Sequence, residues 1–110
     1  MNTLQKLIEK DKIQPYYEEW NMLEKEIREI FSSRQQSAEA SMNKGFYLYK
    51  ALLAQCSTED DSVVPLNHAE RLEFIEANRS NYAAFRQLAE LFKEMDKKLA
   101  SKRAMLHKLE

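Results

Sequence analysis

The chain has 110 residues, 32% of which are charged, and a formal net charge of −1 at pH 7. Its length suits one domain with a single core, and its single Gly and two Pro argue against a turn-rich sheet protein. The balanced charge excludes a global field that would attract nucleic acid or an acidic membrane, and no apolar run of about 18 residues could cross a bilayer.

The first 14 residues predict a short extra helix ahead of the main fold. Thr3 is a suitable cap, and apolar residues follow it at Leu4, Leu7 and Ile8. Pro15 interrupts this pattern, because the residue before a proline avoids the helical region while proline itself suits the first position of a helix. We therefore expect the first long helix to begin at Pro15.

Two long helices are predicted before the middle of the chain, each with an apolar stripe at helical spacing. The first ends near Ser33, and its stripe is Tyr16, Trp20, Leu23, Ile27, Ile30 and Phe31. The stripe of the second is Ala38, Met42, Phe46, Tyr49, Leu53 and Cys56. Gly45 lies inside the second pattern, where a glycine often permits close approach of a neighbouring ring. We place Trp20 or another aromatic side chain against it.

Residues 57–66 form the predicted long loop, and the acidic triplet Glu59, Asp60 and Asp61 makes it the expected mobile region. A short helix over about residues 67–77 follows. Asn67 and Glu70 have the spacing of a capping box, in which each side chain bonds a backbone N–H of the first turn. Leu66 would pack just before this cap as a loose hydrophobic staple.

Ser80 is the candidate cap of the last helix, of about 25 residues or roughly 40 Å. Its apolar stripe is Tyr82, Phe85, Leu88, Ala89, Phe92, Met95, Leu99 and Leu106. The fold expected over residues 1–110 is an all-α, antiparallel helical bundle of three long helices plus one short helix. The last helix would overhang this bundle and leave Leu99 and Leu106 in need of a partner.

A family resemblance is carried by two stretches on either side of the predicted helix corner, with a third near the N-terminus. The matching positions are Pro65, Asn67, Glu70, Arg71, Leu72, Phe74, Ile75, Tyr82, Phe85, Gln87, Leu88, Leu91 and Glu94, together with Pro15, Tyr16, Tyr17 and Trp20. In these residues the chain resembles the YpoC-like proteins, small helical proteins of unknown function from Bacillus- and Listeria-type bacteria. The resemblance implies an intracellular bacterial protein, and it supplies no activity, ligand or catalytic residue.

No enzymatic site, cofactor or metal is expected from the residues. Neither His68 nor His107 has a glutamate three positions earlier, as helical di-metal sites require, and one cysteine with two distant histidines poorly serves zinc. His68 is interpreted as an exposed residue at a helix start rather than an acid or base. Cys56 is interpreted as a buried small hydrophobe rather than a reactive thiol.

Five residues are candidates for an interaction surface or a cleft, namely Tyr17, Trp20, Tyr47, His68 and Arg71. The aromatic residues among them also suit an ordinary core or a subunit interface. Arg71 and Arg86 lie beside apolar stripes, so each is expected to pair with a glutamate across the helix corner and to fix its angle. This structural role is favoured over ligand binding, which needs several converging polar groups.

The last helix carries a basic patch, Lys97, Lys98, Lys102 and Arg103, which suits phosphate backbones but equally the dipole at a helix C-terminus. Three functions therefore remain open. The first is a non-enzymatic protein-interaction or scaffold domain with a protein partner or a second copy. The alternatives are a nucleic-acid-associated protein and a small-ligand binder. Because Cys56 is the single cysteine and the N-terminus lacks a secretory signal pattern, we expect the cytoplasm and no membrane partner.

Overall fold

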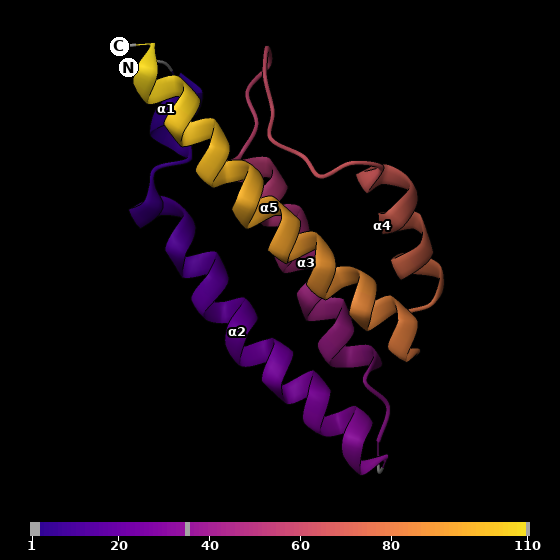
Figure 1. Cartoon of the computed structure of the whole chain (residues 1–110). Coiled ribbons are helices and arrows are strands. Elements are labelled where there is room, and N and C mark those ends of the chain that lie inside the picture. The colour runs from indigo at the N-terminus through magenta and orange to yellow at the C-terminus, as the bar shows by residue number, and fades with distance from the viewer. Residues whose placement is uncertain (1–2, 35, 110) are drawn as a thin grey trace.

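A computed structural model describes residues 3–34 and 36–109, and the fold in this part of the chain is all-α, as predicted. The helices are α1 (Thr3–Leu7), α2 (Lys10–Ser33), α3 (Glu39–Gln55), α4 (His68–Ala77) and α5 (Tyr82–Lys108). In Figure 1, α2 runs in one direction, α3 and α5 run back beside it, and α4 packs along the outer side of α5. The molecule is elongated, with extents of 52 × 25 × 17 Å.

The beginning of α2 differs from the prediction. The helix starts at Lys10, and Pro15 lies inside it with its ring exposed. The Glu9 carbonyl accepts from Ile13 N at 3.1 Å, and Ile13 is only 2% exposed. Burying Ile13 as a helical residue offsets the one backbone donor that the proline removes. Thr3 belongs to α1 itself, so its predicted role as a preceding cap is also wrong.

An aromatic cluster forms the centre of the core between α2, α3 and α5. The ring of Trp20 stacks on Phe92 with centroids 4.2 Å apart and planes 9° apart. Tyr49 meets the same phenylalanine edge to face at 5.3 Å, and Tyr17 does so from α2 at 5.9 Å. The sequence makes Trp20 a candidate for a cleft, a subunit interface or the core. It is 3% exposed, so it belongs to the core.

Gly45 allows this cluster to form. A Cβ atom at that position would lie 3.0 Å from Leu88 Cδ2 and 3.1 Å from Trp20 Cζ3, closer than carbon atoms normally approach. The expected contact between Gly45 and Trp20 is therefore confirmed. On the same helix Leu52 is fully buried and Leu53 only partly so, which places the inward face one residue earlier than predicted at that turn.

Both predicted caps around the helix corner need correction. Asn67 precedes α4, but it adopts a left-handed conformation (φ 55°) and no side-chain cap bond forms there within the described residues. Leu66 is 72% exposed, so the staple is absent as well. Ser80 does not cap α5, because the side chain of Asn81 accepts from Ala84 N at 2.9 Å instead. Asparagine and serine are both good caps, and the tight turn decides which one reaches the helix.

The last helix does not overhang. Leu99 is fully buried and Leu106 is 5% exposed, because α1 folds back against the end of α5 (Figure 1). Arg103 Nε donates to the Ile8 carbonyl at 2.6 Å, and Gln55 Nε2 donates to the Leu7 carbonyl at 2.7 Å. These side chains satisfy carbonyls that the end of a helix leaves unpaired, so the predicted need for a partner at Leu99 and Leu106 is wrong.

The acidic segment is tied to the bundle at two points. Within the segment, Thr58 N donates to the Asp61 carbonyl at 2.7 Å. The first tie to the bundle is the ion pair between Asp61 Oδ2 and Lys102 on α5, at 2.9 Å. Val63 is 5% exposed and anchors the segment on its apolar side. The mobility expected for residues 57–66 stays a prediction. Across the part of the chain described here, no helix has the length and apolar character needed to span a bilayer.

Candidate functional site

Arg71 ties the loop, α4 and α5 together. Its guanidinium donates to Glu94 on α5 through two bonds, of 3.1 and 2.5 Å, and Nη1 also donates to the Leu66 carbonyl at 3.1 Å. The Gln87 amide, with its oxygen toward Arg71, accepts from Nε and from Nη2, the latter at 2.8 Å. The predicted pairing of Arg71 with a glutamate across the corner is confirmed. Arg86 is exposed and has no ion pair within residues 3–34 and 36–109.

The hydrogen bonds from Arg71 lower the pKa of Glu94. A carboxyl group with a lowered pKa in the folded state stabilises the fold above its ordinary pKa, and this contribution is lost as the pH falls through the lowered value. The Arg71 side chain is 19% exposed and that of Glu94 is 37% exposed, so solvent screens the pair in part.

We expect Arg71→Met to lower the free energy of unfolding by about 1–2 kcal/mol, because it removes charge-assisted hydrogen bonds to three partners. A double-mutant cycle with Glu94→Gln should give a coupling of about 1 kcal/mol in urea titrations at neutral pH. The coupling should vanish at a pH below the folded pKa of Glu94. A coupling that is unchanged by acid would contradict the assigned ion pair.

The candidate cleft residues lie on different parts of the surface and core. The Tyr17 hydroxyl donates to the Phe92 carbonyl at 2.6 Å and so ties α2 to α5. Tyr47 on α3 is 61% exposed and packs only against Phe46 among the described rings. His68 and Arg71 lie on α4. The geometry does not bring these four side chains into one hollow.

The histidine candidate is half-buried and the cysteine candidate is fully buried. His68 is half-buried with a buried Nδ1 that finds no hydrogen-bond partner among the described residues, so its expected full exposure is wrong. Cys56 is fully buried, and desolvation raises the pKa of its thiol to about 11, as suits a small hydrophobe. In residues 3–34 and 36–109 no three His, Cys, Asp or Glu side chains gather where they could hold a metal ion.

The predicted basic patch is divided by the fold. Lys97 and Lys98 are exposed on α5. Lys102 is engaged by Asp61, and Arg103 is directed at the end of α1. Two of the four cations therefore hold the chain together, which reduces the charge available to a phosphate backbone.

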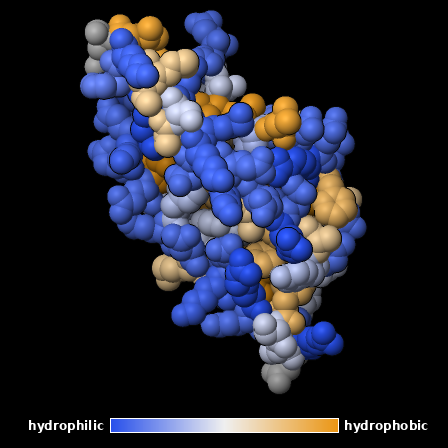
Figure 2. All heavy atoms as spheres, viewed as in Figure 1, coloured by the Kyte–Doolittle hydropathy of each residue, from blue (hydrophilic) through white to orange (hydrophobic). Residues whose placement is uncertain are grey.

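An apolar groove lies between α5 and the segment that leads into α4, and we call it the α4–α5 groove. It consists of two adjoining hollows of about 360 and 340 Å³ that share Val64 and Lys98. The side chains that line it are Ser62, Val63, Val64, Pro65, Leu66, Asn67, His68, Ala69, Glu70, Lys98, Ser101, Lys102 and Met105. Figure 2 shows hydrophobic surface gathered in this region, between blue surface on α5 and on α4.

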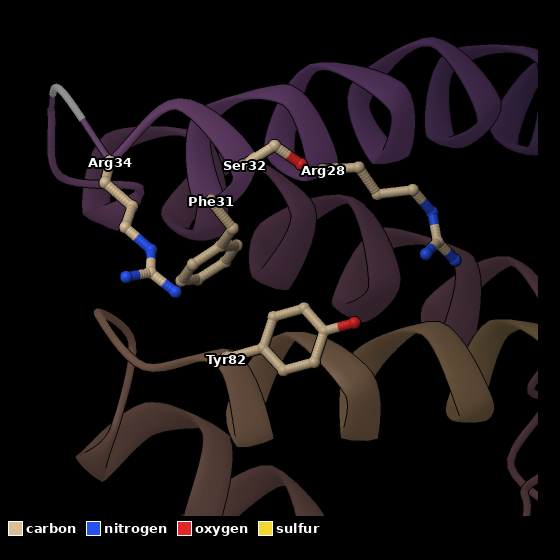
Figure 3. A pocket seen from close by; sticks show the side chains of 5 residues that line it. All are labelled: Arg28, Phe31, Ser32, Arg34 and Tyr82. Atoms are coloured by element: carbon tan, nitrogen blue, oxygen red, sulfur yellow. The ribbon is translucent and has the colours of Figure 1, made fainter.

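A further hollow lies where α2 ends and α5 begins, and we call it the arginine hollow. It measures about 620 Å³ and is lined by Arg28, Phe31, Ser32, Arg34 and Tyr82. In the close view of Figure 3, the guanidinium groups of Arg28 and Arg34 lie on opposite sides of the Phe31 and Tyr82 rings. The sequence did not predict this site. By their spacing Phe31 and Tyr82 belong to the apolar stripes of their helices, and neither arginine belongs to a recognisable motif.

The fold of the described residues defines the class of protein as a small all-α helical bundle, and the α4–α5 groove and the arginine hollow are open sites on its surface. The chain belongs to the YpoC-like protein family, whose model matches residues 10–107, most of its length. No curated protein and no solved structure matches it. The family assignment agrees with the resemblance seen in the sequence.

Proposed function

We propose that this chain is a non-enzymatic cytoplasmic protein-interaction domain that docks a partner in the α4–α5 groove. The observation that carries the proposal is the exposure of Leu66 (72%) and Met105 (48%) beside the half-buried Val64. Met105 lines one hollow of the groove and Leu66 lines the other, and Val64 lines both, so the three side chains border adjoining surface. Contiguous exposed apolar surface of this kind is typical of binding sites.

The partner is a short amphipathic segment that carries carboxylates beside large apolar side chains. Lys98 lies between the two hollows, and neither Lys98 nor the exposed Lys97 has an ion pair within the described residues. Lys102 contributes less charge, since Asp61 already engages it. A carboxylate on the partner complements Lys98, while its apolar side chains cover Leu66 and Met105.

The backbone around the groove is held in a defined shape, which favours recognition over non-specific adhesion. Arg71 binds the Leu66 carbonyl, and Val63 N donates to the Cys56 carbonyl at 3.0 Å. A groove that is ordered before binding costs less entropy when a partner docks. Nucleic-acid binding through α5 has less support, because Lys102 and Arg103 are committed to intramolecular contacts.

We expect the wild-type protein to select acidic, apolar-rich sequences from a displayed library of random peptides. Leu66→Ser with Met105→Ser should weaken the selected peptides about tenfold or more, as loss of buried apolar contacts does at an interface centre. The matched control is Met22→Ser with Tyr47→Ser, which removes two large side chains of similar or greater exposure (77% and 61%) from α2 and α3. Titration of labelled peptide, repeated with rising salt, measures both effects.

Two results would contradict the proposal. Selected peptides that bind the groove variant as tightly as wild type would remove the groove from the interaction. Light scattering tests whether a second copy of this chain occupies the groove instead. A wild-type dimer that becomes a monomer on substitution of Leu66 and Met105 would assign the groove to a second copy.

A further inference from the structure

The arginine hollow combines cationic groups with aromatic walls at one end of the bundle. It is formed by the last turns of α2 and the first turn of α5. Its volume of about 620 Å³ lies within the range of pockets that hold small molecules. It is separate from the α4–α5 groove, since the two share no lining residue.

The charge in the hollow is positive. Its lining contains two guanidinium groups and no carboxylate. Arg28 is partly neutralised by Glu24 on the same helix at 3.2 Å. Arg34 is exposed and has no ion pair within residues 3–34 and 36–109, so its guanidinium is available to an anion.

The two arginines are positioned differently, and both positions suit binding. Arg28 lies over the Phe85 ring at 5.3 Å, a cation–π contact that limits the motion of its side chain. Arg34 ends α2 in a left-handed conformation (φ 55°), with its N–H donating to the Ile30 carbonyl. This backbone turn carries the Arg34 side chain to the far side of the rings from Arg28 (Figure 3).

The rings and hydroxyls complete the hollow. Phe31 and Tyr82 meet edge to face at 5.3 Å and 84°, and Tyr82 is 49% exposed, so part of its ring is free to contact a ligand. Ser32 lines the same hollow. Guanidinium groups form paired hydrogen bonds to phosphate oxygens. The serine and tyrosine hydroxyls are additional donors, and a phosphate has more oxygens to accept from them than a carboxylate has.

We propose that the arginine hollow binds a small organic phosphate, with its phosphate held by arginine and its ring or carbon body against Phe31 and Tyr82. Nothing in this assignment requires a chemical step. The ligand binds and leaves unchanged, which is consistent with a non-enzymatic domain but independent of the partner proposed for the α4–α5 groove.

Three probes separate the contribution of the phosphate from that of the ring, namely phenyl phosphate, inorganic phosphate and phenol. We expect phenyl phosphate to shift the side-chain Nε–H signals of Arg28 and Arg34 saturably in nitrogen-15 NMR spectra. Inorganic phosphate should bind more weakly and phenol weakest, because each lacks one of the two recognised parts. Arg34→Gln should weaken phenyl phosphate about tenfold, the effect of one charge-assisted contact.

Two further variants make the test specific. Lys25→Gln removes one positive charge from an exposed position on α2 outside the hollow, and it should leave the affinity nearly unchanged. Tyr82→Ala should weaken phenyl phosphate more than inorganic phosphate, because phenyl phosphate loses both the ring contact and the hydroxyl donor whereas inorganic phosphate loses only the donor. Circular dichroism spectra and melting curves confirm that each variant is folded.

The proposal is overturned if phenyl phosphate causes no saturable shift at millimolar concentration. Equal losses in Arg34→Gln and Lys25→Gln would show attraction by general charge and would also overturn it. Equal affinity for phenyl phosphate and inorganic phosphate would show that the aromatic rings do not contribute to binding. It would therefore overturn the proposal that the ligand has an organic part.

Discussion

Phe92→Ala should lower the free energy of unfolding by about 4 kcal/mol, the largest effect expected for a single substitution in this chain. Phe92 is 1% exposed, and its ring contacts Trp20, Tyr49 and Tyr17. Truncation removes the buried ring and leaves a cavity among rigid neighbours on α2 and α3. Because flat aromatic side chains cannot extend to refill that space, the cavity cost adds to the lost burial.

Urea titration followed by circular dichroism measures this loss. Phe74→Ala is the matched control, since Phe74 has the same ring but is 42% exposed on α4; it should cost about 1 kcal/mol or less. Phe92→Leu should fall between the two, because it keeps part of the apolar volume. A cost below that of Phe74→Ala would show that Phe92 is not the centre of the core.

Gly45→Val should lower the free energy of unfolding by about 2–3 kcal/mol, even though valine has the better helix propensity. The new Cβ would lie within 3.1 Å of Leu88 and Trp20, and the added methyl groups would push α3 away from α2 and α5. Gly45→Ala should have a smaller effect, since a gain of about 1 kcal/mol in helix propensity opposes a clash with the end of a flexible leucine.

Comparison with a variant at Ala51 isolates the contribution of packing. Ala51→Val introduces valine into the same helix at an exposed position, where only its modest propensity cost should appear. The double variant Gly45→Val with Leu88→Ala should lose less stability than the sum of the two single variants, because Leu88 Cδ2 is the nearest atom to the new Cβ and its removal relieves the clash. Losses that simply add would contradict steric conflict at this contact.

Both substitutions also bear on the two proposed surfaces. The groove needs α5 to lie firmly against α4 and the segment before it, and the arginine hollow needs the end of α2 to meet the start of α5. Variants that loosen the aromatic core should therefore weaken both surfaces together. The surface variants at Leu66, Met105 and Arg34 should instead affect one surface and leave unfolding nearly unchanged.

Several local features of the helices were predictable because they depend on periodicity. The stripes of α2 and α5 correctly identify Trp20 and Phe92 as inward-facing, since residues three and four apart share a helix face. The glycine in the α3 stripe indicated a close contact, and Trp20 fills that position. Arg71, charged but beside an apolar stripe, indicated an ion pair across the corner, which forms with Glu94.

The errors occur where neighbouring elements override a local preference. Pro15 favours a helix start, but burial of Ile13 extends α2 by more than a turn before it. Asn67 and Ser80 have the composition of caps, yet the turns place Asn67 in a left-handed conformation and give the cap of α5 to Asn81. Capping preferences differ by about 1 kcal/mol or less, so packing decides among adjacent candidates.

The sequence by itself determined that this chain is helical, which helix faces are apolar, and that it resembles the YpoC-like family. These properties depend on the spacing of residues along single helices. Only the tertiary structure decided that α1 covers the end of α5, that Arg103 and Lys102 are engaged internally, and that Arg28 and Arg34 share a hollow with Tyr82. The physical reason is that a surface site depends on side-chain positions from helices distant in sequence, and helical periodicity specifies faces without specifying which faces meet.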